Sequence, residues 1–309
     1  MRIVFFGNGD FGVPALRRLV ASPHQVVAVI TNPDKPAGRG YVPQPTPIKQ
    51  EALSLGLPVW EVESPKEPSL PDRLRPLGGH AFVVVAYKIL PKAIWEMPPF
   101  GALNIHPSLL PAYRGPAPIP WTIMAGEKET GLTIFRIREG IDTGEIILQR
   151  AYPLPDTWDS GELARFLSEI GAELLIEALE GLALGTLKPY PQPEVPHAPY
   201  APKLTSENTR IQWDKPAKVV YNFIRALSPE PRAWTLLQGK RLQILKAQKL
   251  PPRRITQPPG TVWREDGTTV VACQDGPLRL LYLQVEGKKP LSGEEFAQGY
   301  VQNRYLQLT

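Results

Sequence analysis

The sequence predicts an α/β protein in two parts: a Rossmann-like, mostly parallel sheet in residues 1–188 and a small, oligonucleotide-binding-like (OB-like) β-barrel in residues 204–309. Three observations predict this fold. Short β-rich runs alternate with amphipathic stretches through the first part, which is typical of βα units around a parallel sheet. Six prolines between positions 189 and 202 predict a stiff, extended linker over residues 189–203. Short runs separated by turn residues follow and indicate the barrel.

The hydrophobic pattern defines the expected elements of the first part. Apolar, β-branched runs are the expected strands, at residues 2–6, 25–31, 58–62, 81–86, 102–106, 130–136 and 145–152. Stretches with apolar residues three or four positions apart are the expected helices, at residues 11–21, 48–55, 117–125 and 160–182. Because helices separate many of the strands, a mainly parallel sheet is expected.

The second part combines one amphipathic helix with short alternating runs. The helix is expected over residues 217–227, and the strands over residues 234–237, 241–247, 261–264, 268–273 and 278–285. Charge also separates the two parts. Residues 1–200 contain 18 Lys and Arg against 21 Asp and Glu, whereas residues 201–309 contain 17 against 9. The basic C-terminal part predicts a polyanionic partner, because Lys and Arg displace condensed counterions from phosphates.

Composition excludes several classes of protein. Cys273 is the only cysteine, which excludes an intramolecular disulfide framework and a cysteine-rich metal centre. No apolar run approaches the roughly 18 residues of a membrane span. The residues that follow Met1 lack the apolar segment of a secretion signal. We therefore expect a soluble, cytoplasmic protein with no membrane association and no evident obligate protein partner.

A glycine motif follows the first expected strand. Gly7, Gly9 and Gly12 have the G-x-G-x-x-G spacing of dinucleotide-binding proteins. Asp10 argues against that function, because its carboxylate would repel a pyrophosphate at the helix N-terminus. The second strand also ends in Thr31 instead of the acidic residue that holds a ribose. A tight strand-to-helix turn is the favoured interpretation, and an NAD-dependent oxidoreductase is a remote alternative.

Asn104 and His106 are the strongest candidates for chemistry. Alternation along a strand places both side chains on one face, and the carboxyl end of a strand in an open α/β sheet borders the ligand crevice. Asp142, between Gly140 and Gly144, is the carboxylate that could orient and charge-stabilise the histidine. A structural histidine and an ordinary aspartate turn are the competing interpretations.

Other catalytic classes lack their motifs. The remaining histidines have no ligand spacing relative to His106, so no metal is expected. Ser108 is not part of a G-x-S-x-G elbow, and the chain has no phosphate-binding GKS or GKT loop. An amide, an imidazole and a carboxylate without a protein nucleophile suit direct transfer between two bound substrates.

Several motifs together resemble those of the folate-dependent formyltransferases. They are Asn104-Ile105-His106, Ser108-Leu109-Leu110-Pro111, Tyr113-Arg114-Gly115, Gly140-Ile141-Asp142-Thr143-Gly144, Pro33 to Gly40 and Tyr200 to Leu204. The resemblance covers nearly the whole chain. The Asn, His, Ser-Leu-Leu-Pro and Asp set is specific to the superfamily. The Ala-Gly-Arg-Gly loop and the C-terminal matches indicate the branch that acts on initiator tRNA.

The resemblance implies a formyltransferase domain followed by a tRNA-binding barrel. Its substrates would be 10-formyltetrahydrofolate, which leaves as tetrahydrofolate, and initiator Met-tRNA, with no metal and no NAD. Asn104 and a protonated His106 would stabilise an oxyanion, and Asp142 would keep His106 charged and assist proton removal. The implied folate contacts are Ser108, Leu109, Leu110 and Pro111, and the implied tRNA contacts are Lys35, Arg39 and Lys203.

Two further interpretations stay open at this point. A formyltransferase acting on glycinamide ribonucleotide or an amino sugar nucleotide would use the same site. The glycinamide ribonucleotide formyltransferases resemble only the first 200 residues of this chain. This alternative therefore gives the basic C-terminal part no function. A catalytically silent RNA-binding module would instead bind tRNA with a steep salt dependence and would tolerate the loss of His106.

Overall fold

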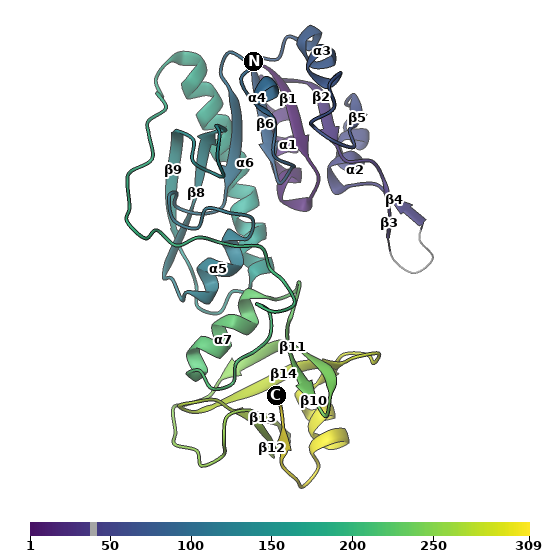
Figure 1. The fold of residues 1–309 in the computed structure, drawn as a ribbon, viewed down its shortest axis with the longest axis vertical. Helices are drawn as coiled ribbons and strands as arrows, with labels where there is room; N and C mark the ends of the chain where they lie inside the picture. The colour runs from purple at the N-terminus through teal and green to yellow at the C-terminus, as the bar shows by residue number, and fades with distance from the viewer. Residues whose placement is uncertain (38–41) are drawn as a thin grey trace. The chain divides into compact units, whose positions relative to one another are not determined.

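The computed structural model describes residues 1–37 and 42–309. Packing divides the chain into two compact units, each with its own sheet (Figure 1). The first unit comprises residues 1–115, 130–152 and 164–200, and the second comprises residues 116–129, 153–163 and 201–309. The predicted class, a mostly parallel α/β sheet followed by an antiparallel β domain, is confirmed.

The first unit is built on a sheet in the order β5-β2-β1-β6-β7-β8-β9. Its strands are β1 (Arg2–Gly7), β2 (Gln25–Thr31), β5 (Val59–Glu61), β6 (Ala81–Val85), β7 (Ala102–His106), β8 (Glu129–Arg136) and β9 (Ile146–Pro153). The strands from β5 to β7 in this order pair in parallel, and β8 pairs with β7 in the antiparallel direction. β6 is apolar and buried throughout, as expected for a central strand covered on both faces.

Helices cover this sheet. They are α1 (Val13–Val20), α2 (Pro47–Ser54), α3 (Leu70–Leu74), α4 (Lys92–Trp95) and α6 (Ser160–Leu184), with 3-10 turns η1 (Asp10–Gly12) and η2 (Arg75–Leu77). α2 begins at an N-cap: the Thr46 hydroxyl accepts a hydrogen bond from the Lys49 amide at 3.0 Å. α3 and α4 were not predicted, because one or two turns show no clear period. Within the described ranges, no helix is both long and apolar enough to cross a membrane.

The glycine motif forms a tight strand-to-helix turn. A Cβ atom on either Gly7 or Gly12 would lie 3.2 Å from the Ile48 side chain of α2. Both glycines therefore allow α2 to pack closely against the end of β1. At the end of β2, the Thr31 hydroxyl lies 2.6 Å from the Thr46 hydroxyl, at the position where a ribose would require a carboxylate.

Two short antiparallel strands form a hairpin between β2 and α2. β3 (Lys35–Ala37) pairs with β4 (Val42–Gln44). Figure 1 shows this hairpin projecting beyond α2, away from the sheet. At its base, the Lys49 ammonium lies 2.7 Å from the Asp34 carboxylate, so an ion pair ties the hairpin to α2.

The second unit is an antiparallel barrel with flanking helices. Its strands are β10 (Ala233–Leu237), β11 (Lys240–Lys249), β12 (Thr261–Glu265), β13 (Thr268–Ala272), β14 (Pro277–Val285), β15 (Leu291–Ser292) and β16 (Leu306–Gln307). Its helices are α5 (Pro118–Met124), α7 (Ala217–Ala226) and α8 (Gly293–Phe296), the last continuing into the π-helical turn η3 (Ala297–Val301). The strands follow the order β10-β11-β14-β13-β12-β16, with β15 paired to β14. Leu308 forms an antiparallel bridge with Leu237 of β10, which closes the barrel.

Alternate side chains of the barrel strands form its core. In β10, Ala233, Thr235 and Leu237 are buried, whereas Trp234 and Leu236 are half-buried on the other face. This period of two predicted the barrel strands. β15 and β16 were not predicted, because two residues are too few to show any period.

Candidate active site

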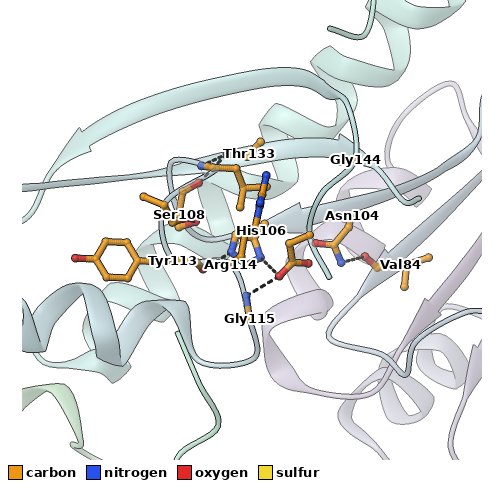
Figure 2. Close-up of polar contacts among 12 residues, drawn as sticks. Val84, Asn104, His106, Ser108, Tyr113, Arg114, Gly115, Thr133 and Gly144 are labelled. Atoms are coloured by element: carbon orange, nitrogen blue, oxygen red, sulfur yellow. Dashed lines mark hydrogen bonds and ion pairs between the residues drawn. The ribbon is translucent and has the colours of Figure 1, made fainter. Parts of the chain in front are cut away.

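The carboxyl ends of β1, β6 and β7 lie at one edge of the first sheet. On either side of β1 lie β2 and β6, so the strand order reverses there. In open α/β sheets, ligands bind at such a switch point. β7 ends at this edge with His106, and Asn104 lies two residues earlier on the same face. Figure 2 shows the two side chains as neighbours at this edge.

His106 is held from both sides of its ring. Its Nε2 atom lies 2.9 Å from the carbonyl oxygen of Tyr113, and its Nδ1 atom lies 3.6 Å from Oδ2 of Asp142. A carbonyl oxygen can only accept a hydrogen bond, so Nε2 carries a hydrogen in both charge states. Nδ1 is therefore the nitrogen that gains and loses a proton, and it faces the Asp142 carboxylate.

The surroundings of His106 act on its charge in opposite directions. The residue is only 5% exposed, and this burial lowers the pKa of His106 below its ordinary value. The Asp142 carboxylate and the Tyr113 carbonyl oppose this effect and raise the pKa, because both favour the imidazolium. The charged form of this buried ring therefore depends on Asp142.

The loop that carries Asp142 has a backbone that few sequences allow. Asp142 has φ +53° and Gly140 has φ +95°, both in the left-handed region. A Cβ atom on Gly144 would lie 1.6 Å from a backbone carbonyl oxygen of β8. Oδ2 of Asp142 also accepts a hydrogen bond from the Gly115 amide at 2.8 Å. The two flanking glycines are needed for different reasons: Gly140 for its positive φ, and Gly144 because a side chain there would overlap β8.

Asn104 presents an amide donor at the same edge. Its Nδ2 atom donates to the Val84 carbonyl of β6 at 2.9 Å, drawn as a dashed line in Figure 2. This bond orients the amide and leaves its second N–H for a ligand. An oriented N–H in a site of low polarity stabilises negative charge on an oxygen more strongly than water does.

The segment expected to contact the folate forms the turn after β7. Ser108 and Leu110 are buried, and the Ser108 hydroxyl donates to a main-chain carbonyl four residues later at 2.7 Å. The Leu110 amide donates to the Thr133 hydroxyl at 3.2 Å. Leu109 and Pro111 are half-buried. The segment therefore offers a ligand the side chains of Leu109 and Pro111, while Ser108 and Leu110 hold the turn.

Sequence reasoning missed Gln192. Nε and Nη2 of Arg114 donate to its Oε1 at 3.1 and 2.5 Å. Its Nε2 donates to the carbonyl oxygens of Asp142 at 2.7 Å and Gly144 at 2.9 Å. Arg114 stood in a motif of the resembled family, but Gln192 lies among prolines and makes contacts 48 to 78 residues away in the chain. No local pattern could have marked it.

The residues expected to contact tRNA are distributed over both units. Lys35 is exposed on β3 of the first unit, and Lys203 is exposed in the second. Arg39 lies outside the described residues. Their role in binding stays a prediction.

The chemistry available to the site is acid–base and electrostatic. Among residues 1–37 and 42–309, no three His, Cys, Asp or Glu side chains gather as metal ligands would. An amide N–H, a titrating imidazole nitrogen and a carboxylate lie together without an activated serine or cysteine. Such a set can stabilise an oxyanion and move a proton while an acyl group passes directly to a nucleophile.

Models of protein families match both parts of the chain. The model described as "Formyl transferase" matches residues 1–179. The model described as "Formyl transferase, C-terminal domain" matches residues 203–301. The first of these matches alone covers more than half of the chain.

Curated relatives are similar over nearly the full length. A methionyl-tRNA formyltransferase of Chlorobium luteolum is 43% identical over 305 residues, which is 97% of this chain and 97% of the relative. One of Porphyromonas gingivalis is 41% identical over 310 residues, which is 97% of this chain and 96% of the relative.

Solved structures share the fold at lower identity. Methionyl-tRNA formyltransferase from Clostridium thermocellum has a TM-score of 0.59 and 18% identity, with 92% of this chain and 98% of that chain covered. HypX from Aquifex aeolicus, solved with tetrahydrofolic acid, has a TM-score of 0.67 and 22% identity over 98% of this chain and 48% of HypX. This chain thus spans about half the length of HypX. WlaRD, a sugar 3N-formyl transferase, has a TM-score of 0.67 and 20% identity over 94% of this chain and 99% of that chain. These likenesses show the fold alone.

Proposed function

The chain belongs to the formyl transferase family, and we propose that it transfers the formyl group of 10-formyltetrahydrofolate to the α-amino group of methionine on initiator tRNA. One observation carries this proposal: relatives named methionyl-tRNA formyltransferase are 41% to 43% identical over 97% of the chain. The similarity extends through both family domains. Translation initiation, in the cytoplasm, would be the setting of this reaction.

The proposed reaction needs no covalent intermediate on the protein. The methionine amine attacks the formyl carbon, a C–N bond forms, and negative charge develops on the formyl oxygen. The Asn104 N–H and the charged His106 stabilise that oxygen. The bond from the formyl carbon to the folate nitrogen then breaks, and that nitrogen takes a proton from Nδ1 of His106. The products are the formylated amine and tetrahydrofolate.

Asp142 has two tasks in this proposal. Its carboxylate favours the imidazolium of His106, against the burial that lowers the pKa of this residue. It also helps to take the proton that the attacking amine must lose, directly or through a water molecule. Both tasks need the carboxylate close to Nδ1, and the distance of 3.6 Å supports them.

The edge of the sheet fits a substrate with an apolar ring system. Leu109 and Pro111 are half-buried there. Ile89, in the loop that follows β6, is 77% exposed, and Ile141, beside Asp142, is 49% exposed. Exposed aliphatic side chains in these loops suit the flat ring of a folate, and Asn104 and His106 would then face the formyl group. We propose Ser108 to Pro111 as the segment that contacts the folate.

The acceptor tRNA accounts for the charge of the C-terminal part. Residues 201–309 have 17 Lys and Arg against 9 Asp and Glu, which favours contact with a phosphate backbone. Lys35 of the β3–β4 hairpin, Arg39 and Lys203 of the second unit are the proposed contacts. Phosphate contacts of this kind position the RNA, and the selection of initiator tRNA needs further contacts.

A formyltransferase for glycinamide ribonucleotide or an amino sugar nucleotide is the alternative. The fold supports it, because a sugar formyl transferase has a TM-score of 0.67 to this chain. The Met-tRNA acceptor is favoured, because the full-length relatives at over 40% identity carry its name.

The experiment offers three amine acceptors to the purified protein together with 10-formyltetrahydrofolate. They are initiator Met-tRNA, glycinamide ribonucleotide and a dTDP-3-amino sugar. Release of tetrahydrofolate is followed by absorbance, and the formylated product by mass spectrometry. Formylmethionine formed with the tRNA alone is the expected result. Turnover with a nucleotide acceptor alone would overturn the proposed acceptor, and no turnover with any acceptor would overturn the proposed activity.

A further inference from the structure

Residues 190–200 form the segment that leads to the second unit. This segment makes hydrogen bonds to the loop that carries Asp142 and to Tyr113, the backbone partner of His106. We infer that this segment positions His106 and Asp142 for catalysis, and that Gln192 is the positioning residue through which it holds Asp142. The inference rests on the proposed function. It assigns a catalytic task to a stretch that the proline pattern predicted only as a stiff linker.

Gln192 uses its whole side-chain amide for this purpose. Its Nε2 atom donates to the carbonyl oxygens of Asp142 at 2.7 Å and Gly144 at 2.9 Å. Its Oε1 atom accepts two hydrogen bonds from Arg114, at 2.5 and 3.1 Å. The amide thus joins the two loops that meet at His106, one carrying Asp142 and the other Arg114.

The backbone at Asp142 needs such support. A non-glycine residue with φ +53° is in a sparsely populated conformation, which persists only when its surroundings over-determine it. Gln192 holds the Asp142 carbonyl, and the Gly115 amide holds the Asp142 carboxylate at 2.8 Å. Without Gln192, the loop is free to relax to a commoner backbone, and the carboxylate leaves Nδ1 of His106.

The same segment also holds the partner of the other imidazole nitrogen. The Tyr113 amide donates to the Pro199 carbonyl at 2.6 Å, while the Tyr113 carbonyl accepts from Nε2 of His106. Arg114 and Tyr200 form a parallel β-bridge beside this contact. Both neighbours of the His106 ring are therefore attached to residues 190–200.

The beginning of the segment is anchored next to the Asp142 loop. Tyr190 and Ile146 form an antiparallel bridge with two backbone hydrogen bonds, at 2.8 and 2.9 Å. This bridge fixes the register in which Gln192 reaches its two carbonyl acceptors. The prolines on either side of Gln192 restrict the backbone and keep it extended.

The test compares Gln192→Met with Glu194→Gln. Methionine has nearly the length of glutamine and no charge, so it removes the four hydrogen bonds without adding a new field at His106. Glu194 lies two residues away, is exposed and serves as the matched control. Arg114→Lys is a second variant, because it keeps the positive charge but loses the two-bond contact with Oε1. Thermal unfolding shows that each variant is folded at the assay temperature.

The measurements are kcat, the KM of both substrates and the pH dependence of kcat. Gln192→Met is expected to lower kcat by at least about tenfold, with both KM values changed by less than about threefold. Its kcat is also expected to fall at a lower pH than in the wild type. Without the carboxylate in place, only the Tyr113 carbonyl opposes the effect of burial, so the pKa of His106 falls further. Arg114→Lys is expected to lower kcat and to move its pH profile to lower pH, with smaller changes than in Gln192→Met.

Each outcome has one meaning. Wild-type kcat in Gln192→Met, or a lower kcat with an unshifted pH profile, would overturn the positioning role. The same loss in Glu194→Gln would also overturn it, because a general weakening of the segment would then explain the effect. A wild-type protein that formylates no acceptor would instead overturn the proposed function, so the two failures are distinguishable.

Discussion

Replacing Asp142 by asparagine isolates the charge of the carboxylate from its shape. Asparagine tolerates a positive φ better than other residues do, which suits the φ of +53° at this position. Its amide oxygen can still accept the hydrogen bond that the Gly115 amide makes at 2.8 Å. Asp142→Asn should therefore leave the loop in place and remove only the charge that faces Nδ1 of His106.

The distance between the two groups sets the size of the effect. At 3.6 Å, two opposite unit charges attract by about 1 kcal/mol in a water-like medium and by about 5 kcal/mol at an effective dielectric constant of about 20. His106 is only 5% exposed, so the attraction exceeds the water value. Proton binding at Nδ1 is therefore expected to weaken at least about fivefold in Asp142→Asn.

The assay is an NMR pH titration of protein with isotope-labelled histidine side chains. The pKa of His106 is expected to fall further below its ordinary value, because burial then acts with less opposition. The protonated ring is the proposed donor, so the upper limb of the pH–rate profile should move to lower pH together with the NMR titration. An unchanged or higher His106 pKa in Asp142→Asn would show that the Asp142 charge does not stabilise the imidazolium.

Three further predictions concern the loops and the RNA. Gly144→Ala should destabilise the protein by at least about 2 kcal/mol in thermal unfolding, because its Cβ would overlap a carbonyl of β8. Gly299→Ala, whose Cβ meets nothing within 4 Å, should leave stability nearly unchanged, and equal unfolding of both variants would contradict this account. Thr133→Val leaves buried main-chain groups of the folate-contacting turn unpaired, which should cost about 1–3 kcal/mol of stability and raise the KM of the folate more than that of the tRNA. An unaltered folate KM would show that Thr133 does not support this turn. Lys35→Ala should raise the KM of the tRNA and reduce the salt dependence of tRNA binding by the equivalent of about one phosphate contact. The same salt dependence in the variant and the wild type would exclude that contact.

Regular elements with a clear period were predictable from the sequence. The ranges expected for β2 and β7, residues 25–31 and 102–106, agree with the structure. β2 is a mostly apolar, β-branched run, and β7 is a short run bounded by Gly101 and Pro107, so local composition is sufficient. α3, α4, the β3–β4 hairpin and β16 were missed, because each is too short for periodicity, and tertiary contacts decide its conformation.

The site was predictable where its geometry is local. Asn104 and His106 lie two residues apart on one strand, so alternation alone places them on one face. Asp142 lies on a separate loop, so the sequence could offer it as a partner for His106 but could not separate that role from an ordinary aspartate turn. Gln192 had no signal at all, since its role consists of side-chain hydrogen bonds to carbonyls about 50 residues away. Sequence patterns report periodicity and do not report such long-range contacts.

A single-turnover measurement of formyl transfer to initiator Met-tRNA by the wild type, Asn104→Ala and His106→Ala shows whether these two residues perform the proposed reaction. Tetrahydrofolate release and tRNA binding are measured on the same samples. We expect formylmethionine with the wild type, a rate about 100- to 10,000-fold lower in either variant, and nearly unchanged tRNA affinity. A wild-type rate in His106→Ala would overturn the proposed site, because formyl transfer would then proceed without it.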